Sequence, residues 1–175
     1  MKGEAVPAVI VTPRLVLRRW TVDDAGALYR YASDWRVSEL ALWPRHTSVD
    51  MSREVIREYF INADTFAVVG KSGDEAIGCI GFVPHGNEHF GGIAENEREV
   101  GYWIGHPFWG RGLIPEALNA LAVYSRDSLG LSKLWLTTDA RNMNSQRVAE
   151  KCGFCHVADV AEGDIVTKVF ARQLD

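Results

Sequence analysis

The chain has 175 residues, of which 47% are hydrophobic and 24% are charged, and its formal net charge is −4 at pH 7. This length and composition predict a single domain over residues 1–175, with a core that needs no metal or disulfide for support. The acidic balance argues against non-specific nucleic-acid binding, no apolar run is long enough to span a membrane, and the N-terminal residues lack a secretory signal. Three cysteines, an odd number, fit a reducing compartment better than a disulfide framework, so we expect a cytoplasmic protein.

The N-terminal third reads as one strand followed by two helices. Alternating residues in Leu15–Arg18 predict the strand. Thr21–Asp24 resembles a capping box with a shorter acid, and apolar residues follow it at helical spacing through Ala32. Residues 33–46 are expected to form a loop whose aromatic side chains cover the core, and Thr47–Asp50 mark the start of the second helix.

A hairpin is expected in the middle of the chain, with strands at Thr65–Val69 and Ala76–Val83 on either side of a tight turn. The residues after it, 84–96, are polar and include glycines, His85 and His89. Histidines in such a loop are more often solvated than bound to a metal, so we expect no metal site there. This loop could also form a lid over a substrate site.

The chain is organised around the stretch Glu99–Leu118, EVGYWIGHPFWGRGLIPEAL. Residues 100–104 suit a buried strand, and apolar residues recur at helical spacing from Leu113 onward. The turn between them contains Gly110 and Gly112, so the free N–H groups of the helix start can bind an anion that approaches the backbone closely. On these residues alone a simple tight turn is an equal alternative, and the ligand stays open.

The glycine turn lacks the features of two common nucleotide sites. It carries neither the lysine and Ser or Thr of a P-loop nor the three-glycine spacing of a dinucleotide fingerprint. The ribose-binding acid of a dinucleotide site is also missing from the expected strand–helix context. A nicotinamide-dependent enzyme is therefore a poor interpretation.

The C-terminal part reads as a strand, a short helix and two further strands. Gly130 suits the end of the helix that follows the glycine turn, and Leu134–Thr138 predict the next strand. Either Asn142 or Asn144 can cap the short helix, and Cys155–Val160 and Ile165–Phe170 predict the last strands. The strand–helix–strand passage implies a parallel pair inside a largely antiparallel sheet.

Two of the three cysteines, Cys152 and Cys155, form an isolated C-x-x-C pair. A thioredoxin-like pair precedes a helix start, whereas these residues flank a glycine where a helix should end. A zinc site needs two more ligands at a suitable spacing, and the sequence offers none. We therefore predict that Cys152 faces the core and that Cys155 lies on a strand.

Four segments together resemble one family. They are TPRLVLRRWTVDDA at Thr12–Ala25, the central stretch Glu99–Leu118, LGLSKLWLTTDARN at Leu129–Asn142 and NSQRVAEKCGF at Asn144–Phe154. This set resembles the GNAT acetyltransferases, especially the branch of the RimJ/RimL protein N-terminal acetyltransferases. The resemblance implies an α+β (mixed α/β) GNAT-like fold, with a mostly antiparallel sheet of about seven strands, a splayed parallel pair and about four flanking helices.

The resemblance also implies acetyl-CoA as cosubstrate and no metal, with the pyrophosphate on backbone amides of the glycine turn and the pantetheine arm between the splayed strands. The family consensus in the turn is Q/R-x-x-G-x-G/A; Gly112 matches it, whereas Trp109 and Ile114 depart from it. A main-chain N–H near Trp103 or Ile104 is implied as the donor to the thioester oxygen. The implied cofactor-binding residues are Trp103, Ile104, Trp109, Gly110, Arg111, Gly112, Leu113, Ile114, Asn142 and Ser145.

The leaving sulfur needs a proton donor. Many GNAT enzymes place a tyrosine in the last short helix, five residues before the equivalent of Phe154, but this chain has Ala149 there, so the usual general acid is absent. The RimJ/RimL-like branch has an N-x-x-S pattern whose serine lies close to the sulfur, and Asn142-Met-Asn-Ser145 matches it. We therefore expect Ser145 to bond or protonate the sulfur and Asn142 to contact the pantetheine; alternatively, both merely cap the helix.

The acceptor amine needs a base and a binding wall. Glu99 opens the central strand beside the expected cleft and is the expected base, with Glu97 or a water chain as alternatives; a solvated strand-end acid is an equal interpretation of Glu99. In the family, the region that holds Trp35 and Trp43 borders the acceptor, so these side chains are expected to bind substrate. Glu116 is expected to support the first turn of its helix electrostatically rather than to catalyse.

The expected function is that of an acetyl-CoA-dependent N-acetyltransferase that acetylates a primary amine by direct attack in a ternary complex. The acceptor is a protein N-terminal α-amine or a small-molecule amine, and the sequence does not separate these two. The alternative is a catalytically silent module that binds or senses acyl-CoA. Six tryptophans leave a homodimer interface open, although burial within one chain is the simpler account.

Overall fold

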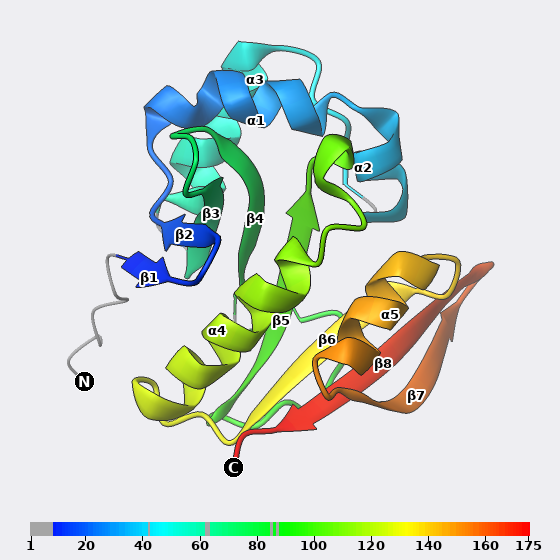
Figure 1. The fold of residues 1–175 in the computed structure, drawn as a ribbon. Helices are drawn as coiled ribbons and strands as arrows, with labels where there is room; N and C mark the ends of the chain where they lie inside the picture. The colour runs from blue at the N-terminus through cyan, green and yellow to red at the C-terminus, as the bar shows by residue number, and fades with distance from the viewer. Residues whose placement is uncertain (1–8, 42, 62–63, 85, 87) are drawn as a thin grey trace.

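The computed structural model describes residues 9–41, 43–61, 64–84, 86 and 88–175, and its strands form one eight-stranded sheet (Figure 1). The strand order is β1-β2-β3-β4-β5-β6-β8-β7. The strands are β1 (Val9–Val11), β2 (Leu15–Arg18), β3 (Thr65–Gly70), β4 (Ala76–Phe82), β5 (Glu97–Ile104), β6 (Lys133–Asp139), β7 (Cys155–Glu162) and β8 (Ile165–Gln173). The α-helices are α1 (Ala25–Ala32), α2 (Trp35–Ala41), α3 (Val49–Val55), α4 (Leu113–Asp127) and α5 (Met143–Lys151). Short turns of other helix types lie at Val22–Asp24, Ile56–Phe60 and His106–Phe108.

The predicted fold class is confirmed, and the described residues contain one strand and one helix beyond those expected. The extra strand is β1, which pairs with β2 but is too short for alternation to reveal it. The extra helix is α2, which lies in the segment expected to be a loop. The carboxylate of Asp34 accepts a hydrogen bond from the backbone N–H of Arg36 at 3.0 Å, and this local contact favours a helix start in place of the expected loop.

Two hydrophobic clusters lie on opposite faces of the sheet. On β3, Phe66 and Val68 belong to the cluster under α4 and α5, whereas Ala67 and Val69 belong to the cluster under α1. This is the two-residue period of a strand that is buried on both faces. Figure 1 shows α4 and α5 on one face, with α1 and α3 packed at the β3–β4 end.

The parallel pair at the centre of the sheet separates along its length. Pairing between β5 and β6 runs from Glu97 opposite Lys133 to Val100 opposite Leu136, where it ends. The pairing of β5 with β4 continues to Ile104. The last half of β5 therefore stays with β4 and leaves β6, as the two diverging strands in Figure 1 show. The predicted splayed pair is confirmed.

Two helix ends differ from those predicted: α4 ends at Asp127, with Ser128 and not Gly130 as its C-cap, and α3 has a different N-cap. Thr21 and Asp24 form the predicted capping box, and Asp24 also binds Arg18 through two hydrogen bonds of 2.8 Å. The N-cap of α3 is Ser48, whose hydroxyl accepts from the N–H of Met51, rather than Thr47 or Asp50. None of the helices in the described part of the chain is long and apolar enough to cross a membrane.

The C-x-x-C residues lie where the sequence placed them. Cys152 is buried at the end of α5, with its sulfur 3.6 Å from the carbonyl oxygen of Pro115. Cys155 is exposed at the start of β7. Both are free thiols that face different surroundings.

Candidate active site

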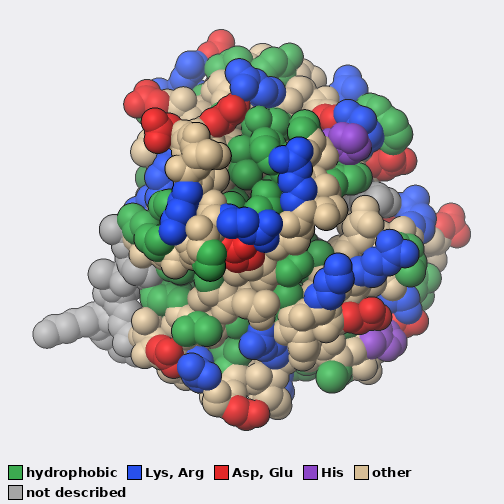
Figure 2. Space-filling view, in the orientation of Figure 1, with side chains coloured by type: hydrophobic (Ala, Val, Ile, Leu, Met, Phe, Trp, Pro, Cys, Tyr) green, Lys and Arg blue, Asp and Glu red, His purple; other side chains and the backbone are tan. Residues whose placement is uncertain are grey.

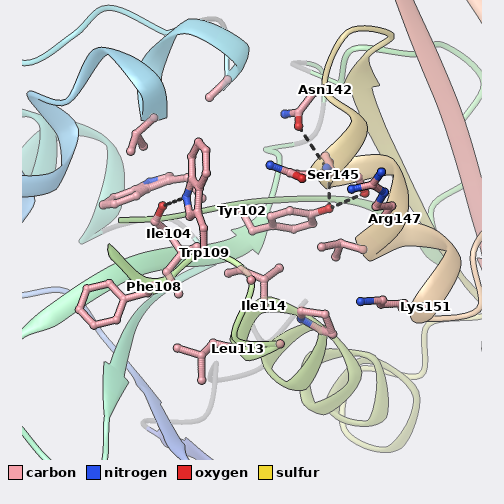
Figure 3. Close-up of a pocket in the computed structure, with 18 of the residues that line it drawn as sticks. Tyr102, Ile104, Phe108, Trp109, Leu113, Ile114, Asn142, Ser145, Arg147 and Lys151 are labelled. Atoms are coloured by element: carbon pink, nitrogen blue, oxygen red, sulfur yellow. Dashed lines mark hydrogen bonds between the residues drawn. The ribbon is translucent and has the colours of Figure 1, made fainter. Parts of the chain in front are cut away.

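Two cavities meet at the gap between β5 and β6. The helix-side cavity, of about 280 Å³, lies beside α4 and α5, and Figure 3 shows its lining side chains. The loop-side cavity, of about 890 Å³, lies on the α1 and α3 face. Five of the described residues line both cavities: Ala41, Tyr102, Trp103, Asn142 and Ser145. A molecule bound in one cavity can therefore contact a molecule bound in the other cavity through the gap.

The glycine turn, residues 109–114, borders the helix-side cavity. Gly110 and Gly112 both have φ of +72°, a left-handed conformation that favours glycine. A Cβ atom added to Gly110 would meet no atom within 4 Å, so there is free space beside the turn. Helix α4 begins at Leu113, and its first-turn N–H groups have no partner within the helix. Pro115 lacks an N–H and suits this first turn.

Glu116 ties the glycine turn to the N-terminal segment, a larger role than the one predicted for it. Its carboxylate accepts hydrogen bonds from the Thr12 hydroxyl at 2.6 Å, the Arg14 backbone N–H at 2.8 Å and the Arg14 guanidinium at 2.6 Å. Arg14 in turn donates to the carbonyl oxygens of Arg111 and Gly112. Burial alone would raise the pKa of Glu116, but these donors lower it below its usual value.

Positive side chains surround the helix-side cavity. Arg147 and Lys151 project from α5 toward it, and Arg36 lines it from α2 (Figure 3). Figure 2 shows Lys and Arg side chains on both sides of a hollow in this face of the molecule. Free backbone N–H groups with cations nearby can bind a phosphate group.

Alternate residues of β5 direct their backbone N–H and C=O groups toward the gap. Val83 N–H donates to the Glu99 carbonyl and Gly105 N–H donates to the Ile77 carbonyl, so odd-numbered residues of β5 bond to β4. Even-numbered residues then direct their N–H and C=O groups toward the gap. The Ile104 carbonyl accepts the indole N–H of Trp109 at 2.8 Å, in agreement with this direction. Of the two expected donors, Ile104 therefore faces the gap and Trp103 faces β4.

A half-buried tyrosine, Tyr102, which the sequence analysis missed, lies beside Ser145. The hydroxyl of Tyr102 is 2.9 Å from the Ser145 hydroxyl and 3.3 Å from the Ser145 carbonyl oxygen (Figure 3). Burial raises the pKa of Tyr102, so its phenol keeps its proton at neutral pH. Asn142 caps α5, because its side-chain oxygen accepts the Ser145 N–H at 3.1 Å, and it lines both cavities as well. The alternation of β5 could have pointed to Tyr102 in the sequence, because the even-numbered residues Val100 and Tyr102 face α4 and α5.

Glu99 lies in the loop-side cavity and binds a histidine. Its carboxylate accepts from the Thr137 hydroxyl at 2.6 Å and lies 2.9 Å from Nδ1 of His89. His89 is exposed, as expected for a solvated loop histidine, but it also contacts Glu99, which the sequence did not indicate; His85 lies outside the described residues. Trp43 and Trp103 also line this cavity, with ring centroids 6.0 Å apart, as expected for an aromatic wall.

Two expected substrate-binding residues lie elsewhere. Trp35 is 59% exposed and lines neither of the two cavities. Glu97 also lines neither; its carboxylate pairs with Lys133 at 2.9 Å and accepts the indole N–H of Trp135 at 2.6 Å. This pair joins the N-terminal ends of β5 and β6, where the strands are still hydrogen-bonded to each other.

Comparison with known proteins places these features in context. A family model described as an acetyltransferase (GNAT) domain matches residues 14–155. An uncharacterized N-acetyltransferase, p20, of Bacillus licheniformis is 30% identical over 152 residues, which cover 83% of this chain and 81% of the relative. Similar solved structures include a GNAT-family acetyltransferase from Bacillus anthracis (TM-score 0.81, 22% identity, 94% of this chain and 98% of that one). They also include RimL, a ribosomal L7/L12 α-N-protein acetyltransferase, in complex with coenzyme A (TM-score 0.79, 19% identity, 95% and 98% covered).

Proposed function

The chain belongs to the GNAT acetyltransferase family and is an N-acetyltransferase, and from this premise we propose that it moves the acetyl group of acetyl-CoA to a primary amine by direct attack in a ternary complex. The observation that carries the proposal is the meeting of two cavities where β5 and β6 part. A cofactor in the helix-side cavity and an acceptor in the loop-side cavity can react through this gap without a covalent enzyme intermediate.

The residues of the helix-side cavity fit acetyl-CoA. The open side of Gly110, the first-turn N–H groups of α4 and the cations Arg147 and Lys151 suit its phosphates. The backbone of Ile104 faces the gap and can pair with an extended pantetheine amide as a neighbouring strand would. When bound, acetyl-CoA supplies a thioester whose carbon is open to attack by an amine.

We assign the Ile104 N–H as donor to the oxygen on which negative charge develops, because it is fixed in place before reaction. We assign the Tyr102–Ser145 pair to the leaving sulfur. The two hydroxyls are 2.9 Å apart, and the tyrosine keeps its proton at neutral pH. Tyr102 on β5 thus supplies a phenol in place of the tyrosine that many GNAT enzymes carry at the position of Ala149.

The acceptor is a protein N-terminal α-amine or a small amine, and we favour the N-terminal amine. An α-amine, with a pKa of about 8, reaches its neutral form more readily than a lysine near about 10.4. The loop-side cavity, of about 890 Å³, has room for the first residues of a peptide. Similarity in fold to RimL, an α-N-protein acetyltransferase, is consistent with this choice.

The direct test begins with the melting temperature in the presence of acetyl-CoA, with NAD and ATP as controls. A ligand at a hundred times its dissociation constant stabilises the fold by about 2.7 kcal/mol, so acetyl-CoA alone should give a clear shift. A panel of peptides and small amines then tests turnover by release of free CoA thiol. No shift at millimolar acetyl-CoA would overturn the cofactor assignment, and a shift without turnover of any amine would favour the silent acyl-CoA-binding module.

Variants at the sulfur provide the second test. Ser145→Ala and Tyr102→Phe should each lower kcat at saturating acetyl-CoA by about 10-fold or more, because each removes a hydroxyl that is proposed to donate to the leaving sulfur. The dissociation constant for CoA should change little, since the phosphates bind elsewhere. An unchanged kcat in both variants would show that the pair has no role at the sulfur.

We further propose that the enzyme acts in the cytoplasm. Its three cysteines, Cys79, Cys152 and Cys155, are all free, and Cys155 is exposed, which suits a reducing compartment. Fractionation of cells that express the tagged protein tests this placement.

A further inference from the structure

The loop-side cavity contains a histidine–glutamate pair held by several contacts. His89 lies in the loop between β4 and β5, and its Nδ1 is 2.9 Å from Oε1 of Glu99. The backbone N–H of His89 donates to Oε2 of the same carboxylate at 2.8 Å. Thr137 on β6 donates its hydroxyl to Oε1 at 2.6 Å. Three hydrogen bonds thus hold the carboxylate, and two of them come from His89 and fix its ring.

The two members of the pair differ sharply in exposure. The side chain of Glu99 is 1% exposed, whereas that of His89 is 66% exposed. A ligand in the cavity therefore meets the imidazole before the carboxylate. Since Nδ1 is occupied by Glu99, Nε2 is the nitrogen that a ligand can contact, and it has no partner among the residues that the structure describes.

The loop that carries His89 is attached to the sheet next to the pair. The ring of Phe90 packs against that of Trp135 on β6, with centroids 5.2 Å apart. The Trp135 indole is itself fixed by its 2.6 Å hydrogen bond to Glu97. His89 is therefore held in two ways: its ring contacts Glu99 on β5, and its chain neighbour Phe90 packs on Trp135 of β6.

The other titratable groups near His89 have different roles. They are His46, Tyr59, Cys79, Tyr102 and Asp139, which line the same cavity, and Glu88, which adjoins His89 in the chain. Asp139 pairs with Arg141 at 2.7 Å, and His46 is buried beside Ser52, where burial lowers its pKa. The hydrogen bond to Glu99 raises the pKa of His89, against the opposing effect of burial.

We propose that Nε2 of His89 takes the proton from the attacking amine and that Glu99 is its positioning residue. The proposal rests on the acetyltransferase function proposed above. As the amine nitrogen bonds to the acetyl carbon and the carbon–sulfur bond breaks, one N–H proton passes to His89. The Tyr102–Ser145 pair gives a proton to the leaving sulfur. The exposed imidazolium then loses its proton to water, and the hydroxyl pair regains one from water, so the enzyme returns to its starting state.

The alternation of β5 explains why the base and the acid lie on opposite sides of the reacting carbon. Glu99, an odd-numbered residue, lines the loop-side cavity and not the helix-side cavity. Tyr102, an even-numbered residue, faces α5 and Ser145. An amine that enters from the loop side therefore approaches with His89 behind it and the sulfur donor ahead of it.

The test measures kcat and KM of the wild type, His89→Gln and Glu99→Gln over about pH 6–10 at saturating acetyl-CoA. A general base contributes about 10²–10⁴-fold, so His89→Gln should lose at least about 100-fold in kcat and keep its affinity for acetyl-CoA. The acidic limb of the wild-type pH profile that follows His89 should vanish in His89→Gln. Glu99→Gln should move this limb to lower pH, because the ring loses the carboxylate that favours its charged form. Added imidazole should restore part of the His89→Gln rate.

The chain offers a matched control in His156→Gln. His156 lies on β7, its Nε2 is 2.6 Å from an Asp159 oxygen, and it lines neither of the two cavities. This variant should keep wild-type kcat and pH profile. If His89→Gln also keeps both, the proposal is overturned and the pair is only structural. If the wild type binds acetyl-CoA but acetylates no amine, the proposed function and the role of His89 fall together.

Discussion

Substitution of Gly112 by valine should separate the cost of backbone strain from the loss of cofactor binding. Gly112 has φ of +72°, and a residue with a Cβ atom pays about 1–2 kcal/mol in this conformation. The added Cβ would lie 3.7 Å from the Arg14 guanidinium, an ordinary contact, so strain and not collision sets the cost. For a chain of this size, the melting temperature should fall by about 2–8 °C.

Gly130→Val is the matched control for this strain. Gly130 has φ of +64°, no atom lies within 4 Å of its added Cβ, and it follows the opposite end of α4. Its melting temperature should fall by a similar amount. By calorimetry, however, only Gly112→Val should raise the CoA dissociation constant, by at least about tenfold, or 1.4 kcal/mol. Equal affinities in the two variants would refute the placement of the phosphates on the glycine turn.

Three further predictions concern stability. Glu116→Gln should lower the free energy of unfolding by about 1–3 kcal/mol and weaken CoA binding, because its carboxylate holds three donors beside the glycine turn; urea titration and calorimetry measure the two effects. Gly81→Ala should cost about 1–3 kcal/mol in the same urea assay, because its Cβ would collide with the backbone oxygen of Asp64, whereas Gly73→Ala, with no atom within 4 Å, should be nearly neutral. His89→Gln should lower the melting temperature by about 1–3 °C at about pH 5.5, because the His89–Glu99 ion pair stabilises the fold below the pKa that His89 has in the unfolded chain. This difference should disappear as the pH rises through the raised pKa of His89 in the folded protein. A difference that stays constant with pH would contradict the ion pair.

The backbone of the site could be read from the sequence, because it depends on local signals. The glycine turn, the Asn142 cap and the strand–helix–strand passage each involve residues close together in the chain. The wall formed by Trp43 was also expected, on the strength of a family resemblance. Trp35 shared that expectation but lies outside both cavities, because α2 forms where a loop was expected and leaves its side chain exposed.

The side-chain pairs of the site could not be read in this way. Tyr102 and Ser145 are 43 positions apart, and they meet because β5 leaves β6 just where α5 approaches. Glu99 meets Thr137 across 38 positions through the parallel register, and that contact directs the carboxylate toward the loop that carries His89. Periodicity predicts which face a residue occupies, but these meetings depend on the register of β5 against β6 and on where their pairing ends.

The bond between Arg14 and Glu116 spans 102 positions, which imposes an order of events during synthesis on the ribosome. At roughly 5–20 residues per second, Glu116 is added about 5–20 s after Arg14. Neighbouring antiparallel strands β2, β3 and β4 can pair in that interval, but the glycine turn has no partner for its carbonyls until α4 packs onto the waiting N-terminal segment. The glycine turn is therefore completed late, and a nascent chain halted before α4 lacks the phosphate site that we propose there.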